Sequence, residues 1–483
     1  MISQDVSPPV APYDQSTRAR VLRGIATFGM FAAFAGTFWM NLFTIWGYTV
    51  VAVITGGAAL ACLIVARPTI IRSRLPKSLI AYGALAVLSL VWSAYPLGSA
   101  ATLVGAALCT ILGVFVATCF DWPEIIRIIA NALKWVLALS ILFELVVSVF
   151  VRHPVLPFFV DFGDKKPPLL AYWSRDLLFE GGRIQGIQGN ANLLAIITAF
   201  AIVVFALQLA ARSAGRKATI FWLALAVVEF LLSFSTTILL AVVVAAVVLV
   251  AALLIRRAPT PSARTPIYLG FVGVIAVAVA VGAVFHSQLL ALLGKSPDLT
   301  GRLDIWSTVW GLVVQRPVFG WGFSSPWTPW QPPFDDLVIR RGVVQLQAHN
   351  AWLDVWLQLG IIGLVLFAAV ILSILTRTWF LAVDRPRIDH NDQRPYTALS
   401  LAPLLIATVL VVQSLAESRI LTESGWVLVV LLALGTKQSP GWPVPVGAAS
   451  SDPAPATPVP ADPVPAEPVP ADPAPHDPIG QDG

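Results

Sequence analysis

The sequence predicts an all-α, polytopic membrane protein. Of 483 residues, 57% are hydrophobic and only 12% are charged, whereas soluble domains carry roughly 25% charged residues. Apolar runs of about 18 to 25 residues recur along most of the chain, and each is long enough to cross the ~30 Å hydrocarbon core of a bilayer as a helix. The alternating segments of about ten residues that are typical of membrane β-barrels do not occur in the sequence.

The apolar runs indicate about twelve transmembrane helices. They are placed near residues 21–42, 45–66, 78–95, 99–120, 125–151, 190–210, 218–233, 236–255, 266–285, 350–380, 397–416 and 425–437. Cytoplasmic loops of membrane proteins carry an excess of Lys and Arg. Basic clusters such as Arg72, Arg74 and Lys77 all fall on one side of the alternating path. Both termini are therefore expected in the cytoplasm.

This orientation divides the chain into three parts. Residues 1–20 form a cytoplasmic N-terminal segment, residues 21–437 the transmembrane domain, and residues 438–483 a cytoplasmic tail. Two long segments, 152–189 and 286–349, are left outside the membrane. Loops of this length in a compact protein are usually functional, so we expect the chemistry there.

The tail is rich in proline, alanine and acidic residues, as in "DPAPATPVPADPVPAEPVPADPAPHDP". Such a composition gives extended polyproline II and no packed core, so we expect a disordered spacer or a docking site for a cytoplasmic partner. The tail holds six acids, which leaves 31 basic against 20 acidic residues in the rest of the chain. This excess fits cytoplasmic loops facing anionic lipid and an anionic substrate, and it does not favour nucleic acid.

No cofactor is predicted. The three cysteines, Cys62, Cys109 and Cys119, lie in apolar runs without Cys-x-x-Cys spacing, which indicates structural thiols. The sequence has no His-Glu-x-x-His zinc motif and no Gly-x-x-x-x-Gly-Lys-Ser/Thr phosphate loop, so neither a metal nor ATP is expected. Any energy for a reaction must come with the substrate.

The outer segments contain two arginines and a histidine at the membrane surface. Arg183 lies in "GGRIQGIQGNANLLA", before the sixth span, and Arg302 begins an amphipathic helix that carries Leu303, Trp306 and Trp310 on its apolar face and ends before Pro317. An arginine can hold a phosphate by two parallel hydrogen bonds, or it can contact lipid headgroups only.

His349 lies in "AHNAWLDVWLQLGIIG", where an outer loop meets a membrane helix. Imidazole titrates near neutrality, so a positioned histidine can remove a proton from a hydroxyl. The alternative is an ordinary interfacial histidine. Glu144 and Glu229 fall within predicted spans and are further candidates, because carboxylates inside a membrane are often functional.

Three motifs in this region resemble the signature of the O-antigen ligase and polymerase superfamily. They are "TGRLDIW" (300–306), "RPVFGWGF" (316–323) and "AHNAWLDVWLQLGIIGLVLF" (348–367), in the same order and loop context. The segments "RIQGIQGNANLLA" (183–195) and "AESRILTESGWVLVV" (416–430) are similar to further parts of that family. Two positions depart from the family pattern: Thr236 replaces a frequent basic residue, and Asn190-Ala191-Asn192 replaces Asn-Pro-Asn.

The resemblance implies a metal-independent polytopic glycosyltransferase of the bacterial cytoplasmic membrane. Such enzymes transfer a glycan from undecaprenyl pyrophosphate, at the outer face, to a hydroxyl of a glycan or lipid-glycan acceptor in cell-surface polysaccharide assembly. Carried over to this sequence, His349 would be the general base or would orient the acceptor, and Arg183 and Arg302 would hold the pyrophosphate. Asn350 would also contact substrate, and Arg340 or Arg341 would supply the phosphate contact missing at Thr236.

Alternative functions stay open at this point. About twelve helices also suit a transporter or flippase of lipid-linked sugars, although carriers usually show two related halves. A polyprenyl-phosphate mannosyltransferase would resemble its relatives in an acidic pair in the first outer loop, and the loop around "MNLFTIW" has no carboxylate. Ligase and polymerase share one fold and one donor chemistry. The composition gives no hint of a lipid A core partner, which favours polymerase or exopolysaccharide assembly.

Overall fold

The computed structural model describes residues 16–285, 288, 302–340, 343–384 and 396–438. The predicted tail and the loop segment 289–301 lie outside these residues. The described part is mostly helical, which confirms an all-α membrane protein. One short antiparallel pair, β1 (Ile339–Arg340) with β2 (Val343–Val344), is the exception.

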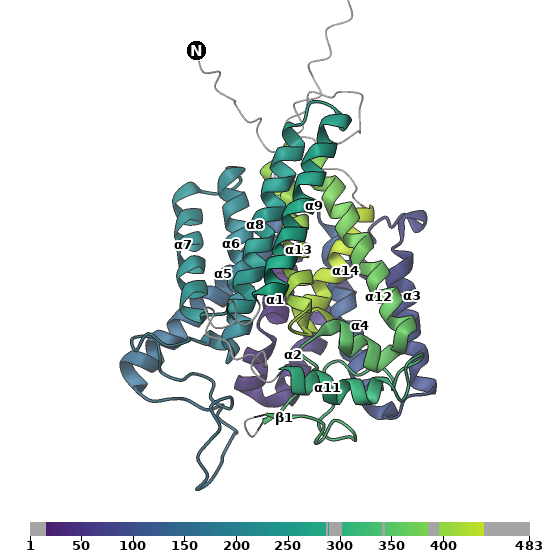
Figure 1. The fold of residues 1–483 in the computed structure, drawn as a ribbon. Helices are drawn as coiled ribbons and strands as arrows, with labels where there is room; N and C mark the ends of the chain where they lie inside the picture. Colours follow the sequence, from purple (N-terminus) through teal and green to yellow (C-terminus); the bar gives the residue numbers. More distant parts are fainter. Residues whose placement is uncertain (1–15, 286–287, 289–301, 341–342, 385–395, 439–483) are drawn as a thin grey trace, which may run out of the picture. The chain divides into compact units, whose positions relative to one another are not determined.

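The helices follow one another along the chain as drawn in Figure 1. The α-helices are α1 (Thr17–Phe34), α2 (Gly36–Ala66), α3 (Lys77–Leu88), α4 (Pro96–Cys119), α5 (Trp122–Val146), α6 (Ala191–Ala210), α7 (Arg216–Ser233), α8 (Thr236–Arg257), α9 (Pro261–Val284), α11 (Arg302–Val313), α12 (Ala351–Val383), α13 (Ala402–Ser414) and α14 (Glu423–Gln438). The single turns are η1 (Arg72–Arg74), η2 (Ser89–Val91), η3 (Val147–Val151), η4 (Gly186–Gln188), η5 (Ala398–Leu401) and η6 (Arg419–Leu421).

Seven helices in the described part are long and apolar enough to cross a membrane, so the predicted number of twelve spans is not supported. The seven are α2, α4, α5 with η3, α6, α8, α9 and α12. The other five predicted spans coincide with α1, α3, α7, α13 and α14. These helices are shorter than the roughly 20 residues that a crossing needs, or they carry several charges, as α1 does at Arg18, Arg20 and Arg23.

The boundary between the first two helices differs from the prediction. We expected one span to reach residue 42, but α1 ends at Phe34 and α2 begins at Gly36. The side chain of Gln188 fixes this break, because its amide donates to the Phe34 carbonyl oxygen at 2.8 Å and accepts from Thr37 Oγ1 at 2.7 Å. The expected loop near residue 44 is a kink inside α2, where Thr44 has a φ of 67°.

Packed helices place a continuous apolar core beneath the outer segments. Helix α14 packs on α4, α13 packs on α8, and α6 packs on both α5 and α7. Small residues allow the closest approaches; a side chain at Gly113 of α4 would meet Val430 of α14 at 2.8 Å. The three cysteines are free, as expected for structural thiols.

Helix α12 is broken where the "PVFGWG" segment packs against it. Gly360 has a φ of 65°, and the amide of Ile361 donates to the Pro317 carbonyl oxygen at 2.9 Å. Trp321 donates its amide to the Leu357 carbonyl oxygen, also at 2.9 Å. The loop thus satisfies the backbone groups that the break leaves without partners, which is required at membrane depth.

Helix α11 confirms the predicted helix that begins at Arg302 and ends before Pro317. Residues four apart share one face of a helix, and Ile305, Val309 and Val313 form a buried face. Leu303 and Trp310, on the apolar face that we expected at the membrane surface, are each 46% exposed, and their contact with lipid stays a prediction. Figure 1 shows α11 beside one end of α12, and the two helices are in contact.

Gly360→Ala should destabilise the protein by roughly 1–3 kcal/mol, because a residue with a side chain is strained at a positive φ. The new Cβ would also contact the carbonyl oxygen of Val318. Thermal unfolding of the purified protein in detergent measures the effect. Gly311→Ala in α11 is the control, since a Cβ there meets nothing within 4 Å and alanine favours the helix. Equal midpoints for Gly360→Ala and wild type would contradict this account of the break.

Candidate active site

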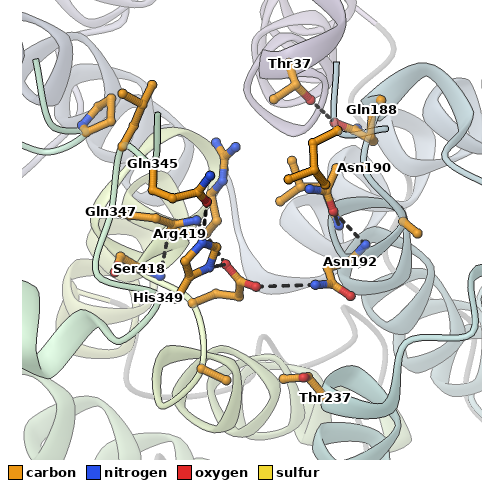
Figure 2. A pocket seen from close by; sticks show the side chains of 18 of the residues that line it. Thr37, Gln188, Asn190, Asn192, Thr237, Gln345, Gln347, His349, Ser418 and Arg419 are labelled. Carbon is orange, nitrogen blue, oxygen red and sulfur yellow. Dashed lines mark hydrogen bonds and ion pairs between the residues drawn. The ribbon is translucent and has the colours of Figure 1, made fainter. Parts of the chain in front are cut away.

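A cavity of about 1130 Å³ lies among the outer segments. Figure 2 shows His349, Gln345 and Gln347 on one side of it, with Asn190 and Asn192 on the other. Its polar and charged lining residues include Arg175, Arg183, Gln185, Gln188, Asn190, Asn192, Thr236, Thr237, Arg302, Gln345, Gln347, His349, Glu417, Ser418, Arg419 and Glu423. All of these residues lie in loops, or at the ends of helices next to those loops. The predicted alternation of the spans places these loops on one side of the membrane.

Glu417, in the connection between α13 and η6, joins the walls of the cavity. Its Oε1 accepts from Arg302 Nη2 at 3.0 Å and from Asn192 Nδ2 at 3.4 Å. Its Oε2 accepts from Gln347 Nε2 at 3.0 Å and lies 2.8 Å from His349 Nδ1. Two of the predicted site residues, Arg302 and His349, are thus held by one carboxylate that the sequence did not single out.

The charge of Glu417 is stabilised by its neighbours. The side chain is 5% exposed, and burial alone would raise its pKa. His349, Arg302 and Arg419 outweigh burial and hold the pKa of Glu417 at about 2. The carboxylate is therefore ionised at neutral pH and can only accept hydrogen bonds. It follows that His349 Nδ1 donates the proton in its contact with Glu417.

The backbone around His349 is fixed by the buried carboxylate of Asp354. Asp354 accepts from the Ala348 amide at 3.0 Å and from Trp327 Nε1 at 2.7 Å. His349 itself adopts a left-handed conformation with a φ of 51°, which turns the chain from the loop into α12. The second ring nitrogen, His349 Nε2, lies 3.1 Å from Gln345 Oε1, and both residues line the cavity.

Arg183 also lines the cavity, but its hydrogen-bond partners are neutral. Its Nε donates to the Ser233 carbonyl oxygen at 3.0 Å, and its Nη2 donates to Asn192 Oδ1 at 2.9 Å. Burial and then the nearby Arg175 lower the pKa of the Arg183 guanidinium. A partly buried cation without a carboxylate partner favours the binding of an anion.

Glu144, one of the two carboxylates expected within spans, organises the loop that carries Arg183. It accepts from Ser174 Oγ at 2.8 Å and from the amides of Gln185 and Gly186 at 2.8 and 2.7 Å. Three donors on one buried carboxylate fix the chain around Arg183 in a single conformation. The other carboxylate, Glu229, is fully buried in α7 and does not line the cavity.

Asn350, which the resemblance implied as a further substrate contact, has a capping role in the structure, and its contact with substrate stays a prediction. Its Oδ1 caps α12, accepting from the amides of Trp352 and Leu353 at 3.0 and 3.2 Å, and it is not among the residues lining the cavity. A side chain that caps a helix has its acceptor already occupied. The backbone of Arg340 belongs to β1, but its side chain and the whole of Arg341 lie outside the described residues.

The cavity contains three charged residues that the sequence reasoning missed besides Glu417. Arg175 and Arg419 line it, and Arg419 Nη1 pairs with Glu423 Oε2 at 3.1 Å. Thr236, at the position where the resembling family frequently has a basic residue, lines the same cavity. The signal that could have found them is the clustering of charges in outer loops, such as "AESRILTE", in a chain with few charges.

The balance of charge in the cavity favours an anion. Four arginines against two glutamates line it, which leaves an excess of two positive charges. The described residues contain no group of three His, Cys, Asp or Glu side chains placed to hold a metal ion. The site therefore offers a histidine with one ring nitrogen on the cavity side, next to arginines that suit phosphate.

Fold and site define a helical membrane protein with a cationic, histidine-containing cavity between its outer loops. Residues 219–368 match the family described as O-Antigen ligase. This match supports membership of the chain in the O-antigen ligase and polymerase superfamily, as the motifs predicted. It includes Arg302 and His349, whereas Arg183 and Glu417 lie outside it. No curated protein matches the chain in sequence.

The low pKa of Glu417 predicts a pH-dependent contribution to stability. Because the folded-state pKa of about 2 is below the ordinary 4.5, the contribution is fully present above about pH 4.5 and is lost as the pH falls toward 2. Wild type should therefore be more stable than Glu417→Gln at pH 7, by on the order of a few kcal/mol, with a smaller difference at pH 3. Thermal unfolding in detergent at pH 7, 5 and 3 measures this difference.

Asp304→Asn serves as the control, because Asp304 is an exposed carboxylate on the same helix as Arg302. Its effect should be much smaller at all three pH values, since exposed charges contribute little. A difference between wild type and Glu417→Gln that does not shrink at pH 3 would count against the ionised carboxylate as its source.

Proposed function

We propose that the protein transfers a glycan from undecaprenyl pyrophosphate to a hydroxyl of a glycan or lipid-glycan acceptor. The reaction takes place at the outer face of a bacterial cytoplasmic membrane and serves cell-surface polysaccharide assembly. The observation that carries the proposal is the single cavity that holds His349 together with Arg183 and Arg302. The family match to O-Antigen ligase supports the same class of reaction.

The proposed reaction is a displacement at the anomeric carbon of the donor glycan. The acceptor oxygen forms a new bond to that carbon while the bond from the carbon to the pyrophosphate oxygen breaks. His349 Nε2 takes the proton of the acceptor hydroxyl as general base. The departing undecaprenyl pyrophosphate carries the negative charge, and arginines stabilise charge that develops in the transition state. No metal or nucleotide takes part in this scheme.

Arg183 and Arg302 contribute differently to binding of the pyrophosphate. Among the residues that the structure describes, Arg183 donates to two neutral partners and forms no ion pair with a carboxylate. Arg302 shares the carboxylate of Glu417 at 3.0 Å, which partly satisfies its charge. The pyrophosphate therefore gains most from Arg183, with Arg302 as a second contact.

A topology with the cavity outside and both termini in the cytoplasm is part of the proposal. Basic clusters such as Arg256 and Arg257 lie at the ends of helices remote from the lining residues, as the positive-inside rule requires. We favour polymerase or exopolysaccharide-type assembly over ligation to lipid A core. The proline-rich tail is proposed to extend into the cytoplasm as a spacer or a docking segment.

The decisive experiment is expression of the protein with its own lipid-linked repeat unit, followed by analysis of the products. Chain extension on the lipid carrier indicates a polymerase, and transfer to a separate acceptor indicates a ligase. Either product should still form in excess EDTA. Movement of the lipid-linked glycan without a new glycosidic bond would instead identify a flippase and would end the proposal.

His349→Ala and Arg302→Ala should leave the protein inserted in the membrane but reduce transfer by about 10²-fold or more, the scale of general-base and charge-stabilising groups. Product formation per unit of membrane protein measures the effect. His153→Ala and Arg257→Ala are matched controls, because both residues are exposed and lie outside the cavity. Wild-type turnover in both site variants would remove the site assignment.

Arg183→Ala should weaken binding of undecaprenyl pyrophosphate at least about tenfold, since hydrogen bonds to charged groups contribute roughly 1.5–3 kcal/mol. Titration of the purified protein in nanodiscs with this lipid measures the dissociation constant. Arg257→Ala is again the control. An unchanged dissociation constant in Arg183→Ala would show that the pyrophosphate binds elsewhere.

A further inference from the structure

The contact between Glu417 and His349 has a chemical consequence for the imidazole ring. A neutral histidine carries one proton, on either Nδ1 or Nε2. The ionised carboxylate of Glu417 lies 2.8 Å from Nδ1 and has no proton to donate. The proton of the neutral ring must then be on Nδ1, and Nε2, on the cavity side, is left with a lone pair.

We infer that Glu417 is a positioning residue that keeps the proton of His349 on Nδ1 and so prepares Nε2 to accept the proton of the acceptor hydroxyl. This inference rests on the proposed function, because it assigns how the proposed base is set up. Glu417 itself does not touch the substrate or the reacting atoms. Its partners Arg302, Asn192 and Gln347 hold the carboxylate in place from three separate segments.

The contact on the other ring nitrogen identifies where the acceptor hydroxyl binds. Gln345 Oε1 lies 3.1 Å from His349 Nε2, and the amide nitrogen of Gln345 donates to the Val343 carbonyl oxygen at 3.0 Å. An amide oxygen accepts only, so this contact suits a doubly protonated ring in the ligand-free cavity. A hydroxyl can donate to Nε2 where Gln345 cannot. The acceptor hydroxyl therefore replaces Gln345 at Nε2 when the ring is neutral.

Charged groups from several elements act on His349. They are Glu417 from the α13–η6 connection, Arg302 from α11, Asp354 from α12, Arg183 from the loop before α6, and the pair Arg419 and Glu423 from η6 and α14. Among these charged groups, only Glu417 contacts the ring directly in the described part of the chain. It is therefore the charged group that decides which ring nitrogen carries the proton.

Nitrogen-15 NMR of the histidine rings tests the inference without any substrate. The chain has only five histidines, so the full-length protein can be labelled at histidine, reconstituted into lipid vesicles and titrated. The signal that disappears in His349→Gln is assigned to His349. In wild type we expect the neutral ring to carry its proton on Nδ1. In Glu417→Gln we expect a mixture of the two tautomers, because the amide that replaces the carboxylate can either accept from Nδ1 or donate to it.

Two further variants separate positioning from a structural role. Glu417→Asp keeps the carboxylate, so the share of neutral rings with the proton on Nδ1 should stay closer to wild type than in Glu417→Gln. Glu423→Gln removes an acid of the same cavity that pairs with Arg419, and it should leave the tautomer of His349 unchanged. Transfer activity of Glu417→Gln should fall by at least about tenfold and by no more than the ~10²–10⁴-fold that a general base supplies.

The outcomes distinguish this inference from the proposed function. The inference is overturned if the neutral His349 ring of the wild type carries its proton on Nε2. This measurement uses wild type alone, so it remains decisive even if Glu417→Gln does not fold. An unchanged tautomer in Glu417→Gln would overturn it as well, while inactive His349→Ala would leave the proposed function intact. Full activity of His349→Ala would instead remove the base itself.

Discussion

The buried carboxylate of Glu417 is the interaction on which the rest of the site depends. It places His349 and Arg302 on the two oxygens of one carboxylate, at 2.8 and 3.0 Å. It also joins α6, α11 and the loop before α12 through Asn192, Arg302 and Gln347. Because its charge is balanced on both oxygens, the carboxylate stays ionised despite burial. The walls of the cavity are therefore held together by the same group that sets its electrostatics.

Helix ends position the functional side chains around that carboxylate. Asn190 and Asn350 each cap the helix that follows, α6 and α12, and so fix where the chain leaves the outer loop. His349 is adjacent to one of these caps and Asn192 to the other. The break of α12 at Gly360 serves the same end, because it lets "PVFGWG" pack beneath the loop and satisfy free backbone groups. Gly320 and Gly322 in the "PVFGWG" segment and Gly360 in α12 all have positive φ values. This backbone conformation explains why glycine stands at these three positions.

Much of the fold and part of the site could be predicted from the sequence. Apolar runs located the helices, and the scarcity of charged residues drew attention to Arg183, Arg302 and His349. Glu417 could not be found in this way, since its partners Arg302 and His349 are 115 and 68 residues away in the chain. The break between α1 and α2 depends on Gln188, which is also far from Phe34 in the sequence. The capping role of Asn350 follows from asparagine preceding an apolar helix, which is a common cap, whereas its contact with substrate stays a prediction.

The two arginines of the proposed pyrophosphate site differ in their state before the donor arrives. Arg302 already has a carboxylate partner, whereas Arg183 has a carbonyl and an amide oxygen and loses proton affinity through burial. A dianionic pyrophosphate that binds Arg183 therefore neutralises an uncompensated charge, while contact with Arg302 only adds to an existing pair. Glu417 can then keep its hydrogen bond to His349 throughout donor binding, because the donor does not need to displace it. Holding the donor is thus assigned mainly to Arg183 and preparing the base to Glu417, and this separation lets one cavity bind a strong anion without disturbing the histidine beside it.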